Sequence, residues 1–209
     1  MFKRVRKPAA ILLLIAFIFM LVPAQAETPD TTGLFGTLSG DRYENTFIGI
    51  GCKLEGWHYS SDEEIEGINQ LANEQLSENI HELYGQMIVL MAATSADATR
   101  NTNIQIINVQ QNIALIRQSG LHTIAKASLS EFKSTLVSGG FTDVQASVDS
   151  MKIGEEEVPC LVGNGKFNGM PIYYRQLWLL RGDFLVYITV ISHSTDTTEA
   201  ILSCYYPLP

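Results

Sequence analysis

The sequence is poor in basic residues: 14 Lys and Arg stand against 22 Asp and Glu, and the formal net charge is −8. Four of the basic residues lie in the first seven positions, and without them the net charge is −12. Such a surface repels nucleic-acid phosphates and anionic lipid headgroups, so we expect neither as a partner. Any macromolecular partner is therefore expected to be a protein.

Cysteine is also scarce, with only Cys52, Cys160 and Cys204 in the chain. An odd number allows one disulfide and a leftover thiol, or three free thiols, and the sequence does not choose among the three possible pairings. Cys52 and Cys160 share the apolar phase of their predicted strands. We therefore predict that both are buried, more readily as free thiols than as a disulfide.

The sequence has no signature of a catalytic or metal site. The histidines His58, His81, His122 and His193 have no metal-binding spacing, and no Gly-x-Ser-x-Gly nucleophile motif is present. We assign no catalytic, cofactor-binding or metal-ligating residue, expect no cofactor, and predict that the protein is not an enzyme.

Three segments resemble functional motifs but have simpler explanations. The acidic residues Asp62, Glu63, Glu64 and Glu66 fit the start of a helix, whose positive end favours carboxylates. Residues 155–157 are all Glu and fit a solvated hairpin turn. The glycines of Gly163–Gly169 resemble a phosphate-binding loop, but strands are predicted on both sides, so we expect an ordinary turn.

The amino terminus has the features of an export signal. Lys3, Arg4, Arg6 and Lys7 precede an apolar run over residues 9–22, and Ala24-Gln25-Ala26 fits a cleavage site. We predict a signal peptide at 1–26, a flexible leader at 27–40 and a single domain at 41–209. The protein is then secreted or held at the exterior of the cell envelope, without stable membrane insertion unless the apolar segment is retained as an anchor.

Periodicity predicts several strands and helices in the remaining chain. Alternation predicts strands near 48–54, 144–148 and 158–162, and longer strands at 170–181 and 184–193 joined by Gly182-Asp183. Apolar spacing predicts three helices. The first begins at Ser61 with a Ser61–Glu64 capping box, the second covers 121–136, and the third covers 196–205 with an Asp196–Glu199 capping box. The order and the close hairpins favour an α+β domain with an antiparallel sheet.

The segment Tyr43–Trp57 resembles the start of PsbP-like domains. It contains an aromatic-x-Asn stretch, a short apolar strand and then Gly56-Trp57. This fold is shared by the photosystem extrinsic subunit PsbP and the Ran-binding protein Mog, and uncharacterised exported proteins of Gram-positive bacteria look similar. The proline that often precedes Gly-Trp in the family is missing, and Leu54-Glu55 stands there. The resemblance implies an antiparallel sheet sandwiched between helices and a binding or assembly role, and no site residue is carried over.

Three functional hypotheses follow from the sequence. The first is an exported, non-catalytic interaction or assembly module, with Trp57 or Tyr205-Tyr206 as candidate contact residues. The second is a small-molecule or lipid-binding protein with a pocket between sheet and helix. The third is a hydrolase, which a Ser–His or Cys–His hydrogen bond inside a cleft would favour.

Overall fold

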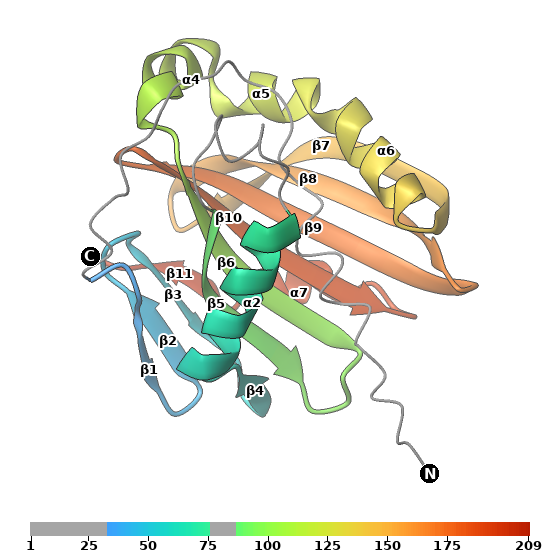
Figure 1. The fold of residues 1–209 in the computed structure, drawn as a ribbon, viewed down its shortest axis with the longest axis horizontal. Helices are drawn as coiled ribbons and strands as arrows, with labels where there is room; N and C mark the ends of the chain where they lie inside the picture. Colours follow the sequence, from blue (N-terminus) through green and yellow to red (C-terminus); the bar gives the residue numbers. More distant parts are fainter. Residues whose placement is uncertain (1–32, 76–86) are drawn as a thin grey trace.

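The computed structural model describes residues 33–75 and 87–209, which form two antiparallel sheets and flanking helices (Figure 1). The predicted signal peptide and His81 lie outside these residues. The smaller sheet has the order β1 (Thr37–Ser39), β2 (Arg42–Asn45), β3 (Ile50–Lys53), β11 (Tyr205–Pro207). The larger sheet has the order β4 (Trp57–Tyr59), β5 (Met87–Ser95), β6 (Arg100–Asn108), β10 (Phe184–His193), β9 (Met170–Arg181), β8 (Glu156–Phe167), β7 (Phe141–Ile153).

The helices flank the sheets, which confirms the predicted α+β class. The described α-helices are α2 (Asp62–Gln75), α4 (Ile113–Ser119), α5 (Leu121–Ala127), α6 (Leu129–Ser138) and α7 (Thr198–Leu202). The helix predicted over 121–136 is thus two helices that meet at Ser128, and a 3₁₀ turn (Gln110–Asn112) precedes α4.

The large sheet has a hydrophobic core on each face. On one face, its side chains pack against the small sheet and α7, so the first and last strands of the domain close the same core. On the other face, they pack against α4, α5 and α6. The sequence did not predict that the small sheet is separate, because its strands are short and come from both ends of the chain.

The long hairpin of β9 and β10 is confirmed with the predicted bounds. Gly182-Asp183 connects the strands, and Gly182 has a positive φ of 58° that favours glycine. Both strands lie inside the large sheet rather than at its edge, as their bulky residues on both faces indicate.

The predicted turn at Gly163–Gly169 is wrong for most of its length. Residues up to Phe167 belong to β8, and only Asn168-Gly169 form the turn to β9. Gly163 is needed for close packing instead, because a Cβ there would lie 2.9 Å from the ring of Phe132 on α6. A strand therefore contains the glycine-rich segment, and the resemblance to a phosphate-binding loop has no structural basis.

The last predicted helix is also too long. It ends at Leu202, and Tyr205–Pro207 forms β11, which pairs with β3. Asp196 accepts a hydrogen bond from the backbone N–H of Thr198 at 3.0 Å, whereas Glu199 forms an ion pair with Arg175. The predicted Asp196–Glu199 capping box is therefore not formed, because the partner of Glu199 comes from β9.

The domain begins before the predicted boundary at residue 41. Leu34 is buried in the core, and Asn45 Nδ2 donates a 2.7 Å hydrogen bond to its carbonyl. Residues 37–39 form β1, which pairs with β2. From Leu34 on, the segment predicted as a flexible leader thus packs on the domain.

Candidate functional site

The two faces of the central strands β6, β10 and β9 differ in chemistry. The face toward the small sheet carries branched aliphatic residues: Ile104, Ile106, Leu177, Leu179, Ile188 and Val190. The opposite face carries a group of polar and aromatic side chains, all buried, which we call the Thr189 cluster: Asn103, Gln105, Tyr174, Gln176, Trp178, Tyr187 and Thr189. Buried amides are uncommon at the centre of a sheet, so this face is the candidate site.

Strand register brings the cluster together. Thr189 on β10 lies opposite Asn103 on β6 and Gln176 on β9. Two residues earlier on β10, Tyr187 lies opposite Gln105 and Trp178. Because side chains two residues apart share a face, these two rows form one continuous patch.

Hydrogen bonds connect the members of the cluster. Gln176 Nε2 donates to Thr189 Oγ1 at 3.0 Å, and Trp178 Nε1 donates to Gln176 Oε1 at 2.8 Å. The rings of Trp178 and Tyr187 meet edge to face, with centroids 5.1 Å apart. These contacts give the aromatic side of the cluster a fixed arrangement.

Asn103 is only partly satisfied. Its Oδ1 accepts a 2.8 Å hydrogen bond from Gln105 Nε2, but among the residues that the structure describes its Nδ2 has no hydrogen-bond partner, although Asn103 is 1% exposed. A buried amide donor without a partner costs about 1–3 kcal/mol of stability. The cluster therefore holds one buried donor that no described residue engages.

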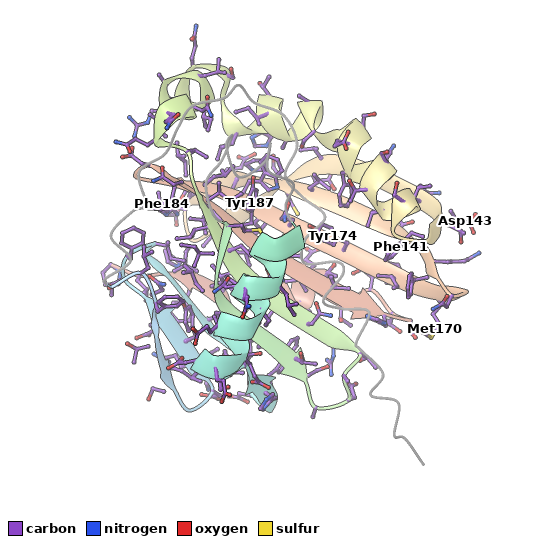
Figure 2. All side chains as sticks on the ribbon, viewed as in Figure 1. Phe141, Asp143, Met170, Tyr174, Phe184 and Tyr187 are labelled. Atoms are coloured by element: carbon purple, nitrogen blue, oxygen red, sulfur yellow. The ribbon has the colours of Figure 1, made fainter. Side chains whose placement is uncertain are left out.

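Helices lie on both sides of the cluster. The cluster is centred on β6, β10 and β9. To one side of these strands, α2 packs against β5; to the other side, α5 and α6 pack against β7, β8 and β9. Figure 2 shows Tyr174 and Tyr187 between α2 and α4–α6 in this view.

Each helix group is anchored beside the cluster. On α2, Asn69 donates from Nδ2 to the Val89 carbonyl at 3.1 Å and accepts from its N–H at 2.6 Å, where β5 has a bulge. On α6, Phe132 contacts the ring of Tyr174, with centroids 5.0 Å apart. Burial raises the pKa of Tyr174 above its ordinary value, so its phenol stays neutral.

The candidate residues from the sequence do not converge on a catalytic centre. His58 lies exposed on β4, and His193 lies at the end of β10. In the described residues, no group of three or more His, Cys, Asp or Glu side chains could hold a metal ion. All three cysteines are free, and the predicted burial of Cys52 and Cys160 is confirmed.

One Ser–His pair is present on the surface. His122 Nε2 of α5 lies 2.8 Å from Ser150 Oγ of β7, and the hydrogen bond is exposed to solvent. The described hydrogen bonds give His122 no carboxylate that would orient its ring, as a nucleophile–base pair requires. The pair thus lacks the third group and the shielded position expected of a hydrolase site.

The first acidic segment has the structural role that its position indicates, whereas most of the second lies in a strand. Ser61 N–H donates to Glu64 Oε2 at 2.8 Å, and Glu64 N–H donates to Ser61 Oγ at 3.3 Å, which confirms the capping box of α2. Glu156 accepts two hydrogen bonds from Arg181, at 3.1 and 2.6 Å. Glu156 and Glu157 belong to β8 rather than to the turn.

The candidate aromatic residues occupy different environments. Trp178 is buried, whereas Trp57 is half-buried with the Arg100 guanidinium 5.8 Å above its ring. Tyr205 is buried and its hydroxyl lies 2.6 Å from Thr102 Oγ1, so it is a core residue. Tyr206 is half-buried and donates to Glu44 at 3.0 Å.

Among the described residues, no helix is long and apolar enough to cross a membrane. No family model and no curated protein match the chain. A similar solved structure is that of LpqN, involved in cell envelope biogenesis of Mycobacterium tuberculosis: it has 10% sequence identity and a TM-score of 0.39 over 90% of each chain. This distant likeness carries no inference about function, and the resemblance to PsbP-like domains stays a prediction.

Proposed function

We propose that the protein is an exported, non-catalytic interaction module whose partner protein docks at the outer edge of the small sheet. Export is supported by the basic head, apolar run and cleavage pattern of residues 1–26. A protein partner is favoured by the acidic balance of the chain, which disfavours polyanions and anionic lipids.

The observation that carries the proposal is a group of exposed apolar residues beside β1. Phe35, Leu38 and Phe47 are 52%, 48% and 44% exposed, and we call them, with strand β1, the β1 surface. Asn45 links the backbone beside Phe35 to that beside Phe47, because its Nδ2 donates to the Leu34 carbonyl at 2.7 Å and its Oδ1 accepts from the Ile48 N–H at 3.2 Å. The Phe47 ring meets Phe184 of β10 edge to face, with centroids 5.2 Å apart, and is still 44% exposed. Exposed apolar side chains grouped in this way mark an interaction surface.

The backbone of β1 adds hydrogen-bonding groups to this surface. β1 is an edge strand of the small sheet, and its three residues are exposed. Gly40-Asp41 form the turn, so Ser39 and Arg42 exchange the first pair of hydrogen bonds and Leu38 points its N–H and C=O outward. An extended segment of a partner can pair with those groups and bury Leu38 and the neighbouring rings.

The non-catalytic part of the proposal is supported by the scattered chemistry of the chain. Among the described residues, no carboxylate orients His122 in the exposed Ser150–His122 pair, and burial raises the pKa of the Cys52 and Cys160 thiols to about 11 and about 12. Neither thiol is thus suited to act as a nucleophile at neutral pH.

Photo-cross-linking in exporting cells tests the proposal. A photoreactive phenylalanine analogue at Phe35 or Phe47 is expected to cross-link one shared protein, and the same group at exposed Leu115 on α4 is not. Leu38→Pro removes the outward N–H without breaking a bond to β2 and is expected to abolish the product. Identical products from position 115, or unchanged cross-linking in the Leu38→Pro protein, would contradict the proposal.

A further inference from the structure

The Thr189 cluster lies on the face of the large sheet opposite the small sheet and is independent of the β1 surface. A core built only for stability would continue the aliphatic pattern that the same strands show on their other face. The cluster instead buries two glutamines, an asparagine and a threonine together with three aromatic residues. A fully paired network of this kind could be structural, but this one leaves a donor unused.

The unused donor defines what a ligand must offer. Asn103 Nδ2 is buried without a partner in the described part of the chain, while Asn103 Oδ1 already accepts a hydrogen bond from Gln105 Nε2. A ligand therefore has to present a hydrogen-bond acceptor at this position. Gaining that bond removes the penalty of a buried, unsatisfied amide, so binding is favoured by more than the bond alone.

The surroundings of Asn103 define the charge of the ligand. The seven side chains of the cluster are all uncharged, and burial raises the pKa of Tyr174, so its phenol is neutral. A carboxylate or ammonium group brought here would lose its hydration without meeting an opposite charge, which disfavours its binding. A neutral carbonyl compound meets the donor without that cost.

The register also places an aromatic wall near the donor. Thr189 separates Asn103 from Gln176, and Tyr187, one row away, contacts Trp178 edge to face. Ligand pockets commonly combine such aromatic groups with a few fixed polar atoms that set orientation. A flat ligand is therefore favoured over a branched aliphatic one.

We propose that the Thr189 cluster binds a small, flat, uncharged molecule that presents a carbonyl oxygen to Asn103 Nδ2.

Matched probes separate the chemical classes. Benzamide and nicotinamide carry a neutral carbonyl on a flat ring, benzoate is anionic, and benzylamine is cationic. Saturation-transfer NMR with the mature chain at millimolar probe is expected to show transfer to the two amides and at least fivefold less to the charged probes. Absence of transfer to both amides, or equal transfer to benzoate, would overturn the proposal.

Two variants locate the binding. Asn103→Leu keeps the approximate side-chain volume but removes the donor, and transfer to benzamide is expected to fall at least fivefold. Ile104→Val, one residue along β6 and on the opposite face, is expected to leave it unchanged. Unchanged transfer in a folded Asn103→Leu protein would show that the amides bind elsewhere.

A measurement on the unmutated chain keeps the test independent of folding. The side-chain NH₂ resonance of Asn103 is expected to shift on addition of benzamide, because Nδ2 gains an acceptor. Leu38→Pro in the β1 surface is expected to leave this shift intact, so the failure of one proposal does not decide the other. A resonance that does not move at saturating benzamide would contradict the site.

Discussion

At the scale of single residues, the three cysteine thiols differ in access to solvent. Cys52 and Cys160 are fully buried, whereas Cys204 is partly exposed. Burial raises the pKa of the Cys52 thiol to about 11 and that of Cys160 to about 12, and it also raises the pKa of Cys204. Only the thiolate reacts with common labels, so a raised pKa lowers the rate at a given pH.

Native labelling is therefore expected to modify Cys204 first. With a disulfide reagent at pH 8, Cys204 should react at least tenfold faster than Cys52 and Cys160, and all three should react at similar rates in denaturant. Peptide mapping by mass spectrometry identifies the labelled positions. Labelling of Cys52 as fast as that of Cys204 would mean that β3 does not have the register described.

Two glycines test opposite effects of an added methyl group. Gly163→Ala on β8 places a Cβ 2.9 Å from the Phe132 ring and is expected to lower the free energy of unfolding by about 1–3 kcal/mol. Gly67→Ala on α2 meets nothing within 4 Å and is expected to raise it by up to about 1 kcal/mol. Urea unfolding measures both, and equal effects would contradict the packing of α6 on β8.

At the scale of elements, Arg181 connects three segments of the fold. Its guanidinium donates to both carboxylate oxygens of Glu156 at the start of β8, and its Nε donates to the Ile48 carbonyl at 3.1 Å, just before β3. The contact joins the small sheet to the β8–β9 pair. A bidentate arginine with a backbone acceptor is among the stronger polar contacts in a protein.

Replacement of Arg181 by Met is therefore expected to lower the free energy of unfolding by about 1–2 kcal/mol, because the carbonyl of buried Ile48 loses its donor and the exposed Glu156 loses a bidentate ion pair. Arg42→Met removes an exposed ion pair with Glu44 and serves as the control, with an expected change below about 1 kcal/mol. Chemical denaturation compares the two. An effect of Arg181→Met no larger than that of the control would contradict the connecting role.

Local patterns were sufficient for some elements and not for others. The β9–β10 hairpin and the capping box of α2 could be predicted because their signals lie within a few neighbouring residues. The sequence predicts a turn at Gly163, but glycine is required there because the ring of Phe132 packs against it. That contact joins segments far apart in the chain, so no local pattern shows it. The sequence extends the last helix to Tyr205, the first residue of β11, because the strand that pairs with β11, β3, lies at the other end of the domain.

The candidate site was missed for a related reason. On β6, Asn103 and Gln105 alternate with Ile104 and Ile106, which is the pattern of a strand with one solvated face. Pairing with the interior strand β10 buries the polar phase as well. The sequence does contain one indication of this site. Residues 184–193 are bulky on both faces, which indicates a strand buried on both faces, and a strand that pairs with it is expected to be buried on both faces as well.

At the scale of the whole molecule, the two candidate binding regions lie on different sides of the large sheet. The β1 surface belongs to the small sheet, while the Thr189 cluster faces the side that carries α4–α6. Because the large sheet lies between them and they share no residues, we expect that either region can be changed without the other. This separation is the reason that Leu38→Pro and Asn103→Leu serve as controls for one another.

The proposed export predicts a defined mature protein. Cleavage after Ala24-Gln25-Ala26 is expected to leave Glu27 as the first residue, because signal peptidase requires small residues at that spacing. N-terminal sequencing of protein from the culture medium checks the position. Full-length protein that stays in the membrane fraction would instead show that residues 9–22 are kept as an anchor.

The charge of that mature chain leads to a final prediction about its partners. With a formal net charge of −12 after removal of the four N-terminal basic residues, the molecule should not be retained by DNA or heparin columns at 0.15 M salt. The Debye length there is about 8 Å, so weak attraction by single exposed lysines is screened. An anion-exchange column should retain the same protein and serves as the positive control. Heparin binding that weakens with added salt would reveal a local basic surface and would redirect the search for partners from proteins to polyanions.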